Sequence, residues 1–159
     1  NAQTLTNYDA GRCDVLTTDA SGLYSMRAAA SDPSEHVVLP EIISKEPLGP
    51  VVRQGDDQWF NIVRWSLNAM ITAEELGVTS ATVDEVSNNP ERERIMGRSG
   101  STHEYVGLTP DWTYQIVKQV GNYSESFERN IGINTPIGIA RGVNALWTDG
   151  GILYSPPFR

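Results

Sequence analysis

The clearest pattern of apolar and polar positions along the chain is a helical repeat that begins at residue 57. Apolar side chains recur there at spacings of three and four residues, namely Phe60, Val63, Leu67, Met70 and Ile71. Acidic residues stand at the start, where the helix dipole favours negative charge, and Gly77 stands at the end. The pattern predicts a long amphipathic helix over Asp57–Leu76.

The first quarter of the chain mixes two kinds of pattern and is typical of α/β structure. Helices are predicted over residues 2–10 and 20–30. Short β-branched runs at 12–18 and 36–40 predict two strands. Proline and glycine then punctuate residues 41–55, which predicts an extended strand that crosses between two lobes.

The rest of the chain is predicted to be mostly helical. Three helix starts have a recognisable cap: Thr109-Pro110, the capping-box pair Asn122 and Glu125, and Thr135-Pro136. The helices begun by these caps are expected to run to about Val120, Ile131 and Asp149, with shorter helices at 82–88 and 90–96 and a loop at 98–104. Two prolines predict an extended tail over residues 152–159.

Composition narrows the classes of protein. The 159 residues carry a net charge of −8 and four tryptophans, which indicates one soluble domain or two small lobes. The basic residues are scattered singly, so no nucleic-acid partner is predicted. No apolar run is long enough to span a membrane. Because the opening Asn1-Ala2-Gln3-Thr4 carries no signal peptide, we expect a mature form or a piece of a larger protein.

Chemistry-bearing motifs are sparse. His36, His103 and the lone Cys13 show no metal-ligand spacing, and no phosphate-binding glycine loop or nucleophile motif is present, so no metal, cofactor or enzymatic activity is predicted. We interpret His36 as structural or solvated, His103 as solvated and Cys13 as a buried apolar residue. The Asn122-Tyr123-Ser124 glycosylation pattern is of a kind that arises often by chance.

Two aspartates flank the first predicted strand. Asp14 lies near its start and Asp19 at its carboxyl end, just before a predicted helix. A carboxylate in that second position can cap the helix, or it can face the crevice where open α/β sheets bind ligands. Position alone leaves both interpretations of Asp19 open.

Long stretches of the chain resemble the general L-amino-acid-binding subunits of polar amino-acid ABC transporters, which are periplasmic (family 3) solute-binding proteins. The residues between Ser80 and Glu104 depart from this resemblance. The matching segments are Tyr8–Tyr24, His36–Asp57, Val120–Tyr123, Phe127–Asn130, Ala140–Trp147 and Tyr154–Arg159.

The resemblance implies the C-terminal half of a two-lobe periplasmic-binding-protein type 2 fold, α/β with a mostly helical C-terminal region. It implies that residues 1–45 form part of lobe 2, residues 46–56 a crossing segment, and residues 57–159 part of lobe 1 plus C-terminal helices. The implied function is periplasmic binding of a free L-amino acid by lobe closure and its delivery to a membrane permease. The missing N-terminal half is then a further expected partner.

The resemblance also implies a role for Asp19, because an acid at the matching position in the family holds the ligand's α-ammonium group. The family's arginine for the α-carboxylate lies in the other half, so none of Arg53, Arg64 or Arg141 is assigned that role. Cys13 is expected to be an orphaned buried thiol or half of a disulfide bridge.

Two alternatives remain open at this stage. One is a half-molecule that pairs with a copy of itself without independent ligand binding, because unpaired strand edges favour assembly. The other is a dehydratase-like enzyme on the same fold, which would need an acid/base pair in the cleft. The preferred amino acid is not predicted.

Overall fold

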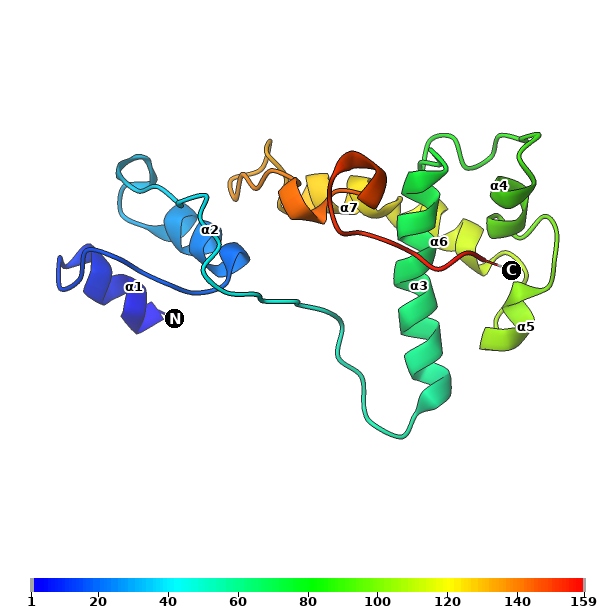
Figure 1. The fold of residues 1–159 in the computed structure, drawn as a ribbon, viewed down its shortest axis with the longest axis horizontal. Helices are drawn as coiled ribbons and strands as arrows, with labels where there is room; N and C mark the ends of the chain where they lie inside the picture. The colour runs from blue at the N-terminus through cyan, green and yellow to red at the C-terminus, as the bar shows by residue number, and fades with distance from the viewer. Residues whose placement is uncertain (1, 159) are drawn as a thin grey trace. The chain divides into compact units, whose positions relative to one another are not determined.

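The structure is a computed structural model that describes residues 2–158 (Figure 1). The chain divides into two compact units. Unit 1 comprises the residues up to Gly49 together with Ile131–Ala140, and unit 2 comprises Pro50–Asn130 together with the residues from Arg141 onward. The first boundary lies inside the segment 46–56. The assignment of residue ranges to two lobes and a crossing stays a prediction.

Unit 1 is built from short helices and irregular chain. Its elements are α1 (Ala2–Asp9), α2 (Ala20–Ala29) and the 3-10 turn η1 (Pro33–Glu35), so both helices predicted here are confirmed. The Tyr8 hydroxyl lies 3.0 Å from Nδ1 of His36, and the Arg27 guanidinium donates to the carbonyl of Ile137. No residue of α2 is buried, so few apolar contacts stabilise this unit.

The strands predicted at 12–18, 36–40 and 41–55 are wrong for this chain, because the described residues contain no strand. A strand is defined by hydrogen bonds to a neighbouring strand, and none of the three segments has one here. The α/β class is therefore not confirmed. Apolar side chains that a sheet would cover are instead exposed, among them Val15, Val37 (77%), Leu39, Ile42, Ile43 (81%) and Leu48.

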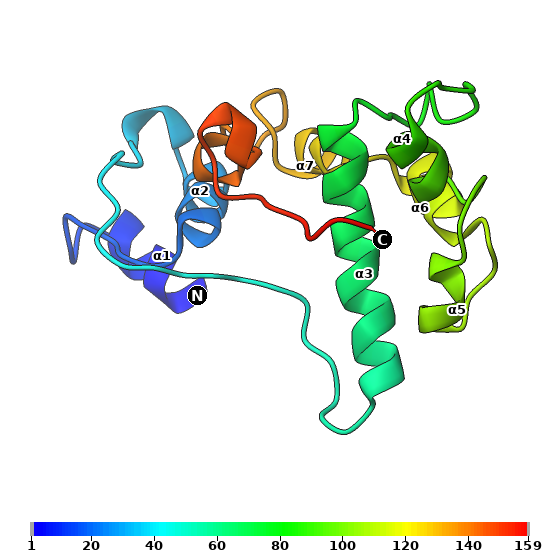
Figure 2. The ribbon, with the colours of Figure 1, turned by 45° about the vertical axis from the view of Figure 1, so that its right-hand side comes forward.

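Unit 2 is a helical assembly around the long helix α3 (Asp57–Glu75), which confirms the strongest prediction (Figure 2). Helix α3 contacts all four of α4 (Pro90–Ile95), α5 (Thr102–Val106), α6 (Trp112–Val120) and α7 (Tyr123–Asn130). The core comprises Ala69, Ala73, Val78, Val83, Ile95, Met96, Val106, Trp112, Val117 and Phe158. No helix within residues 2–158 combines the length and the apolar character needed to cross a membrane.

The C-terminal tail closes this core. As predicted, its described residues form no helix. Phe158 is buried and meets Trp65 edge-on, with ring centroids 5.0 Å apart. Its carbonyl accepts a hydrogen bond from Arg94, and the Thr72 hydroxyl of α3 donates to the Ser155 hydroxyl.

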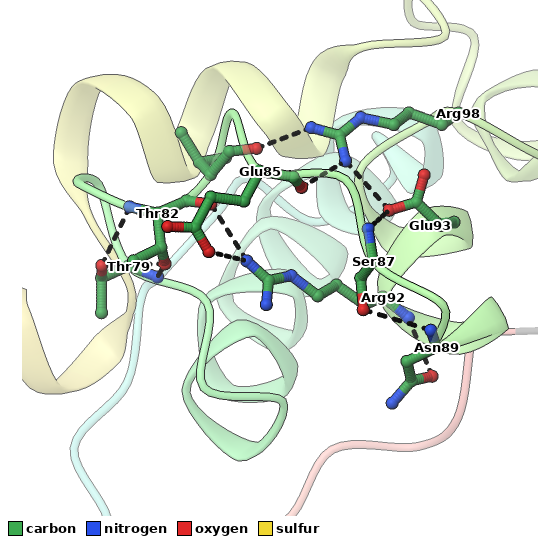
Figure 3. Close-up of polar contacts among 9 residues, drawn as sticks. Thr79, Thr82, Glu85, Ser87, Asn89, Arg92, Glu93 and Arg98 are labelled. Carbon is green, nitrogen blue, oxygen red and sulfur yellow. Dashed lines mark hydrogen bonds and ion pairs between the residues drawn. The ribbon is translucent and has the colours of Figure 1, made fainter.

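The helix predicted at 82–88 is wrong, because this segment forms a turn. Two arginines stabilise the turn by donating to backbone carbonyls (Figure 3). Arg98 binds the carbonyls of Val83 and Glu85, and Arg92 binds the carbonyl of Thr82. These side-chain bonds replace the backbone bonds that a helix would have made.

Three further boundaries differ from prediction. Helix α5 begins at Thr102, inside the expected loop, and α6 begins at Trp112 rather than at Thr109-Pro110. The long helix expected from Thr135 is wrong. Only the 3-10 turns η2 (Gly142–Asn144) and η3 (Trp147–Asp149) form there. Gly138 and Gly142 adopt positive φ angles of 70° and 48°, which end a right-handed helix.

The predicted capping box at the start of α7 is confirmed. The Asn122 side chain accepts from the Glu125 N–H at 2.9 Å, and the Glu125 carboxylate accepts from the Asn122 N–H at 2.8 Å. Asn122 is buried, and its amide nitrogen donates to the carbonyl of Val78. The side chain of this apparent glycosylation site is therefore already engaged in the core.

A nearly buried ion pair joins the C-terminal segment to α3. The Arg141 guanidinium lies 2.9 Å from the Glu74 carboxylate, and the two side chains are 17% and 13% exposed. The same guanidinium stacks over the rings of Tyr123 and Phe127 and donates to the carbonyl of Asn144. One charged group thus connects α3, α7 and the segment around η2.

Replacing Arg141 with Met should lower the unfolding free energy of unit 2 by about 3 kcal/mol, because Glu74 would be left charged and unpaired. Tryptophan fluorescence during denaturant unfolding measures this unit alone, because all four tryptophans lie in it.

The matched control is Lys118→Met, since the Lys118–Asp84 pair is 43% and 59% exposed and should contribute little. Equal losses for the two variants would contradict a special role for Arg141.

Candidate functional site

Asp19 stands where an irregular segment meets the first turn of α2. Its backbone is not helical (φ −58°, ψ 152°), and its side chain accepts a hydrogen bond from the Gly22 N–H. This is the geometry of a helix N-cap, which favours aspartate because the side chain satisfies an otherwise unpaired N–H. The capping interpretation of Asp19 is confirmed.

The two oxygens of the Asp19 carboxylate have different surroundings. Oδ2 accepts from the Ser21 hydroxyl at 2.5 Å and from the Gly22 N–H at 2.7 Å. Oδ1 accepts from the neighbouring Thr18 hydroxyl at the longer distance of 3.2 Å. A carboxylate oxygen has two acceptor positions, so Oδ1 keeps capacity for a further donor.

These hydrogen bonds favour the ionised form of the carboxylate. The Ser21 hydroxyl and then the Gly22 N–H lower the pKa of Asp19 below its ordinary value, against a small opposing effect of burial. The stability that Asp19 contributes is therefore complete above the ordinary aspartate range and is lost as pH falls through the lowered pKa. At neutral pH the side chain is an anionic acceptor suited to an ammonium or guanidinium donor.

An open groove of about 510 Å³ lies beside this carboxylate within unit 1. This volume falls in the range of small-molecule sites. Such sites enclose most of their ligand, whereas this groove is widely open. Its lining comprises Leu5 of α1, the capping residues Thr18, Asp19, Ser21 and Gly22, and the α2 residues Ser25, Met26 and Ala29.

The other candidate residues lie elsewhere or are engaged. Asp14 is exposed. Cys13 is an exposed free thiol, so the expectation that it is buried is wrong. Among residues 2–158, no arginine lines the groove, and Arg141 is paired with Glu74. Across residues 2–158, no three histidine, cysteine or acidic side chains gather as they would to hold a metal ion.

Sequence reasoning missed two members of this site. Ser21 and Gly22 occupy the second and third positions of α2, and these are the positions whose N–H groups an N-cap side chain reaches. The signal was therefore present in the spacing Asp-x-Ser-Gly, but only the structure shows that the Ser21 hydroxyl and the Gly22 N–H both bind one oxygen of Asp19.

Two amino-acid-binding proteins are similar in sequence to this chain. The general L-amino acid-binding periplasmic protein AapJ of Rhizobium johnstonii is 60% identical over 156 residues, which are 96% of this chain and 46% of AapJ. The glutamate/glutamine/aspartate/asparagine-binding protein BztA of Rhodobacter capsulatus is 53% identical over 155 residues, again 46% of its length. No family model matches the chain.

A solved structure agrees with these relatives. An ABC-transporter periplasmic binding protein from Brucella ovis with glutathione bound superposes with a TM-score of 0.93 at 50% identity, covering 99% of this chain and 50% of that one. The chain spans about half the length of the relatives it matches. It matches the C-terminal half of an amino-acid-binding solute-binding protein of ABC transporters, as its sequence resemblance indicated.

Two replacements of Asp19 distinguish its hydrogen bond to the helix end from its negative charge. Asp19→Ala removes the N-cap and should increase the rate of amide hydrogen exchange in the first turn of α2 by about fivefold. Asp19→Asn should leave this rate unchanged, because asparagine caps a helix as well as aspartate does. Exchange measured residue by residue by NMR tests this. An Asp19→Ala chain that exchanges like the parent chain would contradict the capping role.

Proposed function

We propose that this chain is part of a periplasmic protein that captures a free L-amino acid between two lobes and delivers it to the permease of an ABC transporter. The observation that carries the proposal is the Asp19 carboxylate, with one oxygen free to accept a further donor, beside a widely open groove. The match to about half of each amino-acid-binding relative supports it.

The named ligands of the relatives share one chemical group. The amino acids in the names of AapJ and BztA and the glutathione in the Brucella ovis structure all carry an α-ammonium group beside an α-carboxylate. An acceptor-only carboxylate selects the ammonium side of that pair. Asp19 therefore supplies recognition of the part that these ligands have in common, while their side chains are recognised elsewhere.

The proposed lobes follow the ranges expected from the sequence. Residues 1–45 belong to lobe 2, residues 46–56 cross between lobes, and residues 57–159 add to lobe 1. The unit boundary between Gly49 and Pro50 supports the position of the crossing, whereas Ile131–Ala140, which groups with unit 1, departs from the lobe 1 range. The N-terminal half of the protein supplies the strands that cover Val37, Leu39 and Ile43, and the groups that hold the ligand's carboxylate.

Binding, rather than catalysis, suits the groove. Of the described residues that line it, Asp19 alone carries an ionisable side chain. A dehydratase-like reaction needs a second acid or base within reach, whereas lobe closure on a zwitterion breaks no bond. The exposed apolar row at 37–48 also keeps the self-associating half-molecule as the alternative state of the chain alone.

Calorimetry with L-glutamine tests the proposed function. A chimera that joins the N-terminal half of AapJ to this chain should bind one L-glutamine per molecule, while the 159-residue chain alone should bind none. Asp19→Asn in the chimera should weaken binding by about 30-fold or more, because a buried ammonium would lose its charged partner.

Three results would contradict the proposal. Tight binding of L-glutamine by the chain alone would remove the dependence on the other half. A chimera that binds L-glutamine equally well with and without the Asp19→Asn change would remove Asp19 from the site. A chimera without binding, together with a stable dimer of the chain alone by light scattering, would favour the self-associating alternative.

A further inference from the structure

Gly22 is the one glycine in the first turn of α2, and its lack of a side chain has a steric reason. Its φ angle is unremarkable, so the backbone does not require glycine. A Cβ atom at this position would instead lie 2.9 Å from Asp19 Oδ1 and 2.9 Å from the Thr18 methyl carbon. Both distances are below ordinary contact, so a side chain there would displace the carboxylate.

Ser21 acts on the opposite oxygen. Its hydroxyl and the Gly22 N–H both donate to Oδ2, and both belong to residues that line the groove. Two short hydrogen bonds on one oxygen fix the rotation of the carboxylate. The remaining oxygen then lies beside the bare Cα of Gly22 and accepts a hydrogen bond from the Thr18 hydroxyl.

We propose that Ser21 and Gly22 are positioning residues that divide the Asp19 carboxylate into an anchored oxygen, Oδ2, and an open oxygen, Oδ1, which accepts the ligand's α-ammonium group. Ser21 anchors by hydrogen bonding, and Gly22 keeps the space above Oδ1 empty. This inference rests on the proposed function and adds which oxygen binds and which residues orient it. Neither residue needs to touch the ligand to control its affinity.

The steric step is tested without ligand, on the 159-residue chain. NMR titration of the Asp19 carboxyl carbon should give a midpoint closer to the ordinary aspartate value in Gly22→Ala than in the parent, because the displaced carboxylate loses hydrogen bonds to Oδ2. Helix α2 should persist, since alanine favours a helix more than glycine does. An unchanged midpoint would overturn the inference.

The matched control is Gly49→Ala. Gly49 has no positive φ and no atom within 4 Å of a Cβ built on it, so alanine there should leave the Asp19 midpoint unchanged. A midpoint that moves equally in Gly49→Ala would show a general effect of glycine replacement and would also overturn the inference.

The functional step is tested with L-glutamine in the chimera. Gly22→Ala and Ser21→Ala should each weaken binding by about tenfold or more, and Ser21→Thr, which retains the hydroxyl, should restore it. If the parent chimera binds and Gly22→Ala binds equally well, the positioning role is wrong while the proposed function stands. If the parent chimera does not bind, the proposed function itself fails.

Discussion

An extended segment needs a neighbour, because its backbone N–H and C=O groups and one face of its side chains must be covered. The two units differ in how far this requirement is met. In unit 1 the β-branched segments around Val15 and Val37 have no strand beside them within the described residues, and their apolar side chains face solvent. Unit 1 therefore exposes apolar side chains that none of its described elements covers.

Unit 2 buries an apolar core of its own. Its core surrounds α3, the tail closes it through Phe158, and Glu74 with Arg141 joins three of its segments. In its irregular turn, Arg92 and Arg98 bind carbonyls that a helix or strand would have used. In the proposed protein, unit 2 belongs to one lobe, and the N-terminal half completes the other lobe.

Local signals decided which parts of the fold could be predicted from sequence. Helix α3 and the Asn122–Glu125 capping box depend on spacings of three and four residues, and both were predicted correctly. The strands were not, because β-branched runs reveal a preference for strand while pairing depends on distant residues. The expected helix after Thr135 failed because the positive φ angles of Gly138 and Gly142 depend on tertiary context.

The candidate site divides in the same way. The sequence placed Asp19 at a helix start but left its two interpretations as competitors. The geometry shows that they are compatible, because Oδ2 carries the cap while Oδ1 stays open. The spacing Asp-x-Ser-Gly placed Ser21 and Gly22 within reach of the cap, but which oxygen of Asp19 they bind depends on the rotation of that side chain.

The most direct test of ligand binding at Asp19 is the structure of the chimera crystallised with L-glutamine. The ligand's α-ammonium nitrogen should lie about 2.7–3.2 Å from Oδ1 of Asp19, with Oδ2 still bound to Ser21 and the Gly22 N–H. A ligand held without contact to Asp19, or held through Oδ2 with the cap broken, would contradict it.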